Sequence, residues 1–186
     1  MVMTRSSNNR REIEDKLRTL GDYVKIDYLT RCLRENPDFD TRKFILTNLS
    51  KLYEIKGMYA EAARNMLAGA DINTTYDAKI SDFMKSAELF TKANAFSDAD
   101  VAVGKAIASA NTKQKAQIKA QQKALYLEQA KALLQKDKRS HALQAYERVV
   151  QMELNPVEKE NVNKTLVDLY EKLGKVREFY NLKRTM

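Results

Sequence analysis

The sequence contains one cysteine, Cys32, and one histidine, His141, which are its best candidates for covalent or acid–base catalysis. A thiol becomes a nucleophile when a base lies beside it, and residues distant in sequence can meet in a fold. The sequence offers no phosphate-binding loop, cluster of metal ligands or nucleophile motif to accompany this pair. We therefore expect a protein that is not an enzyme, with no catalytic residues, no metal and no cofactor. Cys32 is expected to pack in the interior as a small hydrophobe.

A lysine-rich stretch is the second signal that could carry chemistry. From Lys105 to Arg139, nine basic residues accompany two acidic ones, so this segment carries +7 of the total net charge of +8. Such a segment could bind phosphates or an acidic protein, or it could simply be a solvated helix face. It has no aromatic residue before Tyr126 and no Arg before Arg139, which favours neither base stacking nor bidentate phosphate recognition. The candidate basic patch consists of Lys113, Lys115, Lys119 and Lys123.

The overall composition favours an all-helical protein. The 186 residues include only five Gly and two Pro, and 31% of them are charged. The apolar runs are shorter than the roughly 18 residues that a membrane span needs. The opening segment lacks the apolar core of a secretion signal, and a single cysteine suits a reducing compartment, so we expect a cytoplasmic protein. Residues 1–7 are expected to form a flexible tail.

A weak internal repeat organises the chain. In the stretch LYEIKGMYAEAARNM, Gly57 interrupts two runs of helix formers, which costs a continuous helix about 1 kcal/mol, so it more plausibly separates two helices. The pattern recurs at intervals of 36 to 43 residues. Each copy begins with a large residue, here called the anchor, near the end of a first helix. Four positions after the anchor stands Gly, Asn or Asp, which tolerate a left-handed helix end. Nine positions after the anchor, three copies have Ala, where two helices must approach closely. The anchors and turn residues are Leu17 and Gly21, Tyr53 and Gly57, Phe90 and Asn94, Leu133 and Asp137, and Tyr170 and Gly174.

The boundary signals agree with five helix pairs in a single domain over residues 8–186. Asp40 is expected to cap one first helix, and Ser97 with Asp100 resembles a capping box at the start of a second helix. Asn155 and the Pro that follows it predict the start of the last pair. The predicted pairs lie near 8–34, 40–71, 75–109, 112–152 and 156–184.

The fourth pair contains about six extra residues, worth about one and a half helical turns. Between Thr112 and Lys123 the only large apolar residue is Ile118. We therefore expect the beginning of the basic helix 112–139 to project from the stack.

The stretch LYEIKGMYAEAARNM resembles the turn of a tetratricopeptide repeat, with an aromatic, a glycine, a second aromatic and a small alanine at this spacing. The resemblance spans nearly the whole chain in degenerate copies. It implies an α-solenoid of about five antiparallel helix pairs, wound as a right-handed superhelix, in which the first helices line a concave groove. The groove residues that it implies are Phe44, Thr47, Asn48, Lys51, Met84, Lys85, Glu88, Lys92, Leu127, Lys131, Lys164 and Asp168.

Some members of this family hold a peptide carboxylate with Lys and Asn on adjacent repeats, and the nearest match here is Asn48 and Lys51 with Lys85. The groove positions could also be ordinary solvated helix residues.

We expect a scaffold or adaptor that binds a peptide or helix of another protein in this groove. The alternatives are binding of RNA or an acidic partner through the basic helix 112–139, and self-assembly as a homo-oligomer or as a structural subunit of a larger complex. None of these functions requires a membrane span.

Overall fold

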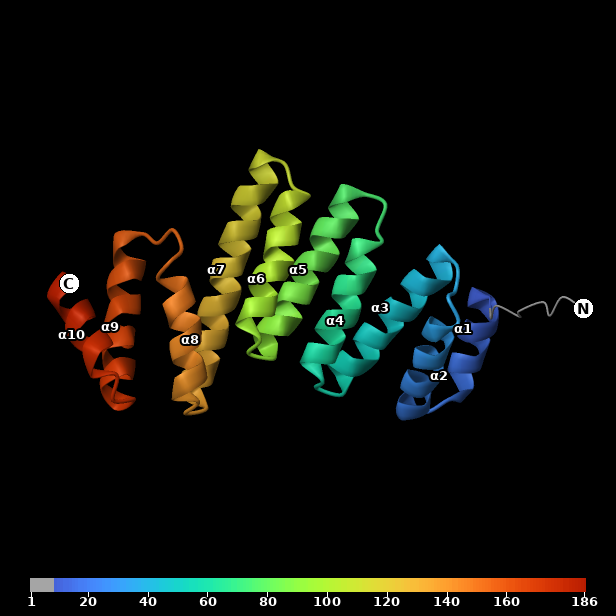
Figure 1. The fold of residues 1–186 in the computed structure, drawn as a ribbon, viewed down its shortest axis with the longest axis horizontal. Helices are drawn as coiled ribbons and strands as arrows, with labels where there is room; N and C mark the ends of the chain where they lie inside the picture. Colours follow the sequence, from blue (N-terminus) through green and yellow to red (C-terminus); the bar gives the residue numbers. More distant parts are fainter. Residues whose placement is uncertain (1–8) are drawn as a thin grey trace, which may run out of the picture. The chain divides into compact units, whose positions relative to one another are not determined.

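The computed structural model describes residues 9–186, and over this range it contains ten α-helices and no strand (Figure 1). The predicted all-α class is therefore confirmed for these residues. The predicted flexible tail, residues 1–7, lies outside the described residues. The helices are α1 (Arg10–Thr19), α2 (Asp22–Arg34), α3 (Phe39–Ile55), α4 (Tyr59–Asp71), α5 (Tyr76–Lys92), α6 (Phe96–Ala108), α7 (Thr112–Gln135), α8 (Arg139–Val149), α9 (Pro156–Lys172) and α10 (Val176–Thr185).

The chain folds into two compact units. The first unit ends at Asn111 and contains α1 to α6, and the second unit, Thr112–Met186, contains α7 to α10. Within each unit, helices that are adjacent in sequence pack on one another from α2 onward. This repeat-like packing agrees with the predicted helix pairs, whereas one continuous domain over residues 8–186 stays a prediction.

Four of the hairpins close with the same hydrogen-bonded turn. After α3, Gly57 takes a left-handed conformation with φ of +72°. The N–H of Met58 donates to the carbonyl oxygen of Tyr53 at 2.9 Å, and the N–H of Gly57 donates to that of Glu54 at 3.0 Å. These two bonds satisfy carbonyls that the helix end would otherwise leave unpaired. The same pair of bonds closes the turns at Asn94, Asp137 and Gly174, with φ of +59°, +53° and +67°.

This turn explains the repeated sequence pattern. In these four copies the carbonyl of the anchor residue accepts from the N–H five residues later. The Gly, Asn or Asp takes the positive φ, and the second helix begins two residues after it. The predicted close approach is also confirmed, because the alanine nine residues after the anchor is fully buried in three copies. These alanines are Ala62, Ala99 and Ala142.

The first copy of the pattern does not form this turn, so its prediction is wrong. Gly21 has φ of −75° and serves as the extended N-cap of α2. The first helix ends at Thr19, two residues after the anchor Leu17 as in the other copies, so it is the conformation of the turn that differs. A positive φ appears instead at Asn36, after α2. This turn requires a residue with a left-handed backbone, and residue type alone does not show that Gly21 lacks that conformation.

Two predicted caps also need correction. The N-cap of α3 is Asp38, whose carboxylate accepts from the N–H of Thr41 at 3.0 Å, and Asp40 lies inside the first turn. The N-cap of α6 is Ala95, so Ser97 lies inside that helix. The predicted start at Asn155 is confirmed by a complete capping box with Glu158.

Two Gly→Ala substitutions test the role of the left-handed turn, and they should have opposite signs. Neither Gly57 nor Gly104 has a non-local atom within 4 Å of an added Cβ, so only the backbone conformation separates them. Gly57→Ala should destabilise the protein by about 1 kcal/mol, because an L-residue is strained at positive φ. Gly104→Ala, inside α6, should stabilise it by up to about 1 kcal/mol. Urea unfolding measures the change in the free energy of unfolding for both variants. Changes of the same sign would contradict the left-handed turn at Gly57.

Candidate protein-binding surfaces

The first-helix surface of the first unit begins with four predicted groove residues on α3. Phe44 is half-buried, and the guanidinium of Arg10 lies 5.0 Å from its ring centroid. The side-chain amide of Asn48 donates to the carbonyl oxygen of Phe44 at 2.8 Å, so its nitrogen is already engaged within the helix. Thr47 is half-buried, and Lys51 is exposed without an ion pair to any described residue. Lys51 therefore offers the free charge on this part of α3.

An ion-pair network joins α3 to α5 on the same surface. The ammonium of Lys85 lies 3.0 Å from a carboxylate oxygen of Glu54 and 3.3 Å from one of Glu88. The ammonium of Lys92 lies 2.6 Å from Glu88 and 3.9 Å from Glu54. Two lysines and two glutamates give this network no net charge. The structure thus brings together three predicted groove residues, Lys85, Glu88 and Lys92, but Lys85 is not a free cation for a ligand carboxylate.

The network shifts the pKa values of its members. Partial burial alone would raise the pKa of Glu88, but the hydrogen bond from Lys92 and the charge of Lys85 outweigh it and lower that pKa. Partial burial alone would lower the pKa of Lys85, but its contacts with Glu54 and Glu88 raise it. Both shifts favour the charged forms, so the network stabilises the folded state at neutral pH. Met84, the remaining predicted groove residue on α5, directly precedes Lys85 in the sequence and is half-buried.

The first helices of the second unit carry the other predicted groove residues. Leu127 is half-buried on α7, and Lys131 is exposed. On α9, Lys164 pairs with Glu160 at 2.6 Å, and Asp168 pairs with Lys172 at 2.8 Å. These are exposed pairs one helical turn apart, which contribute little to stability and are readily exchanged for other contacts.

The predicted basic patch divides into free and engaged lysines. Lys113 and Lys115 are exposed and make no ion pair with other described residues. Lys119 lies 3.5 Å from a carboxylate oxygen of Glu153, whose side chain is 92% exposed. The side chain of Lys123 is only 25% exposed and donates to Glu158 at 2.8 Å and to the carbonyl oxygen of Glu153 at 3.3 Å. We expected residues 112–123 to project freely from the stack. This prediction is wrong for the second half of that segment, because Lys123 is paired with Glu158 at the start of α9.

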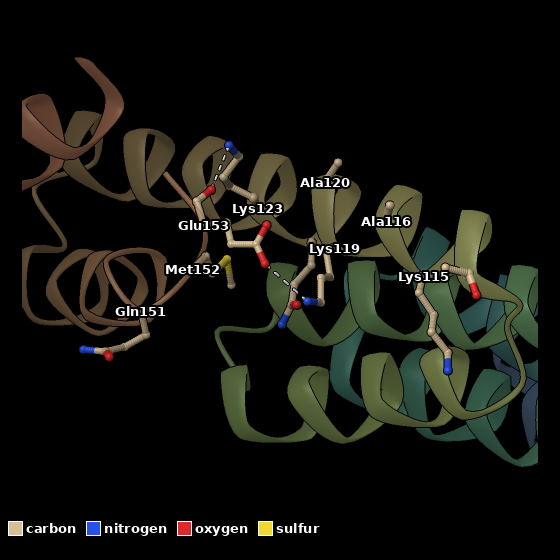
Figure 2. Close-up of a pocket in the computed structure, with 10 residues that line it drawn as sticks. Lys115, Ala116, Lys119, Ala120, Lys123, Gln151, Met152 and Glu153 are labelled. Atoms are coloured by element: carbon tan, nitrogen blue, oxygen red, sulfur yellow. Dashed lines mark hydrogen bonds and ion pairs between the residues drawn. The ribbon is translucent and has the colours of Figure 1, made fainter. Parts of the chain in front are cut away.

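An open cavity of about 610 Å³ lies where the first half of α7 faces the link between α8 and α9 (Figure 2). A helix of 24 residues is about 36 Å long, whereas one of 11 residues is about 17 Å long, so α8 covers only about half of α7. The uncovered half and residues 151–153 form the walls. Figure 2 shows Lys119 and Lys123 reaching toward Glu153 across the cavity. The lining includes three lysines, Lys115, Lys119 and Lys123.

The acidic partners of Lys119 and Lys123 were not predicted from the sequence. Glu158 accepts from Lys123, and it also completes the capping box with Asn155 at the start of α9. The hydrogen bond from Lys123 lowers the pKa of Glu158, and the N–H of Asn155 contributes to the same shift. A separation of 35 residues between Lys123 and Glu158 leaves no local signal for this pair. Met152 and Glu153 were missed for the same reason.

The two residues considered for catalysis lie in different units. Cys32 is 3% exposed in the core of the first unit, as predicted, and His141 is exposed on α8 in the second. Among residues 9–186, no three His, Cys, Asp or Glu side chains converge as a metal site would require. Within the same range, no helix has the length and apolarity to cross a bilayer.

No protein-family model matches the sequence, and no curated protein matches it. Among solved structures, the crystal structure of BtubC (BKLC) from P. vanneervenii matches with 15% sequence identity and a TM-score of 0.38, covering 92% of this chain and 74% of that chain. Similarity at this level assigns neither a family nor a function.

Replacing Glu88 with Gln tests the ion-pair network through its pH dependence. The folded-state pKa of Glu88 is lowered, so its contribution is present above the unfolded pKa of about 4.3 and is lost as the pH falls through the folded pKa. Glu88→Gln should lower the free energy of unfolding by up to about 1 kcal/mol at pH 7, because the pair is partly solvated. The difference from the wild type should shrink as the pH falls from about 5 to 3 in urea titrations. A constant difference over this range would contradict the assignment.

A pair of Lys→Met variants tests the tie between α7 and α9. Lys123→Met keeps the aliphatic stem but removes the donor to Glu158, and it should cost about 1 kcal/mol in urea unfolding. Lys113→Met makes the same change on the same helix at an exposed lysine without an ion pair, and it should stay within about 0.5 kcal/mol of the wild type. Equal losses of unfolding free energy in the two variants would show that stability depends on the positive charge of α7 and not on the contact between Lys123 and Glu158.

Proposed function

We propose that this chain is a non-catalytic protein–protein interaction scaffold, built as a tetratricopeptide-like helical repeat, that binds a helical or extended segment of a partner protein on its first helices. The observation that carries the proposal is the same left-handed, doubly hydrogen-bonded turn in four hairpins. A hairpin repeated with one geometry buries its apolar face by packing on the next, and such arrays serve as extended binding surfaces. The proposal includes the finer architecture, a right-handed superhelix of about five pairs, and a cytoplasmic location.

The first-helix surface has the composition that such binding requires. Phe44 and Met84 are half-buried in the first unit, and Leu127 is half-buried in the second, so a partner could cover the exposed part of these side chains within either unit. Lys51 supplies an exposed charge for specificity. The network around Lys85 fixes α3 against α5, which supports a preformed surface and reduces the cost of ordering it on binding.

A charge reversal at Lys51 tests this proposal, with a matched reversal on a second helix as control. Lys85 is unsuitable, because its reversal would break the network with Glu54 and Glu88. Lys51→Glu should reduce the capture of an acidic partner from a cell extract by roughly fivefold, which corresponds to about 1 kcal/mol. Arg64→Glu, on α4, removes only an exposed pair with Glu61 one turn away, and it should leave the capture of the same protein unchanged. Quantitative mass spectrometry of the captured proteins measures both.

A loss of capture indicates a binding surface only if both variants are folded. Circular dichroism of both variants should show the helix content of the wild type, because both positions are exposed. A set of captured proteins that responds equally to the two variants, or to neither, would contradict binding on the first helices.

A further inference from the structure

The cavity beside the first half of α7 combines free positive charge with a small apolar surface. Lys115 makes no ion pair with a described residue, and Lys119 has only a long contact with the exposed Glu153. These two lysines lie four residues apart, so they project from the same side of α7 one turn apart. The cavity therefore presents two ammonium groups at a fixed helical spacing.

The apolar part of the lining favours a close-packed partner. Ala116 and Ala120 are also four residues apart, and their small side chains let another backbone approach α7 closely. Met152, from the link after α8, lies on the opposite wall, and its flexible thioether adapts to different side chains. A cavity of about 610 Å³ has room for several side chains of a docked segment.

The side chains that line the cavity favour a carboxylate ligand over a phosphate or a nucleic acid. The described residues that line the cavity include no Arg and no aromatic residue, so neither bidentate phosphate recognition nor base stacking is supplied. The protein's own Glu153 already places a carboxylate against Lys119, which shows that this group fits there. Since that carboxylate is 92% exposed, its contact is weak and a competing carboxylate can replace it.

We propose that this cavity is a second protein-binding site, which holds an acidic helical segment of a partner with carboxylates one turn apart on Lys115 and Lys119. The small residues Ala116 and Ala120 receive the backbone of that segment, and Met152 packs against its apolar side chains. Lys123 belongs to the wall and not to the ligand contacts, because Glu158 neutralises it. This site is separate from the first-helix surface of the first unit, so either can fail without the other.

The test uses a fluorescent, Ala-rich helical peptide of about 16 residues with glutamates four residues apart, and a matched peptide in which Gln replaces each Glu. The full chain should bind the Glu peptide, with an affinity that falls as salt is raised, and should not bind the Gln peptide. The double variant Lys115→Glu, Lys119→Glu should weaken binding by roughly tenfold or more. The double variant Lys113→Glu, Lys136→Glu changes the net charge equally at exposed positions that do not line the cavity, and should stay within roughly twofold of the wild type.

Three results would overturn the proposal. The first is no binding of the Glu peptide to the wild type. The second is an equal loss in both double variants, which would show a non-specific charge effect. The third is tighter binding of a single-stranded oligouridine than of the peptide, lost in Lys115→Glu, Lys119→Glu, which would assign the site to nucleic acid. Circular dichroism and urea unfolding of both variants confirm that each is folded, since all four lysines are exposed.

Discussion

A left-handed residue at the end of each first helix is the constraint on which the hairpins from α3 onward depend. Its positive φ reverses the chain within two residues, and the bond from the next N–H to the anchor carbonyl fixes where the second helix begins. That geometry places a fully buried alanine at the contact between the two helices in three pairs. The turn thus sets both the direction of the hairpin and the spacing of its helices.

The structure separates charges that hold helices together from charges that are free to bind. Glu54, Lys85, Glu88 and Lys92 neutralise one another between α3 and α5, and Lys123 and Glu158 do so between α7 and α9. The remaining free lysines include Lys51 and Lys115, which make no ion pair with described residues. A lysine-rich sequence therefore contributes fewer binding groups than its net charge suggests, and the ion pairs show which lysines remain free.

Local signals in the sequence predicted most of the fold. The turn residues Gly57, Asn94, Asp137 and Gly174 were predicted because a left-handed backbone restricts residue type, and the start of α9 was predicted because its capping box spans four consecutive residues. Gly21 was assigned wrongly because glycine also tolerates an extended backbone. The candidate sites were less predictable. The pairing of Lys123 with Glu158, and the cavity wall at Met152, depend on the packing between elements more than 25 residues apart, which no local pattern records.

Hydrogen exchange of four backbone amides tests the repeated turn most directly. Met58, Ala95, Lys138 and Lys175 each donate the bond that closes one hairpin, although each stands at the point where a helix ends and solvent is near. If the turn is the common element of these hairpins, NMR should show all four amides exchanging much more slowly than in an unstructured peptide. Exchange of these amides at the unstructured rate, in a protein whose helix interiors remain protected, would contradict the repeated hairpin and the scaffold built on it.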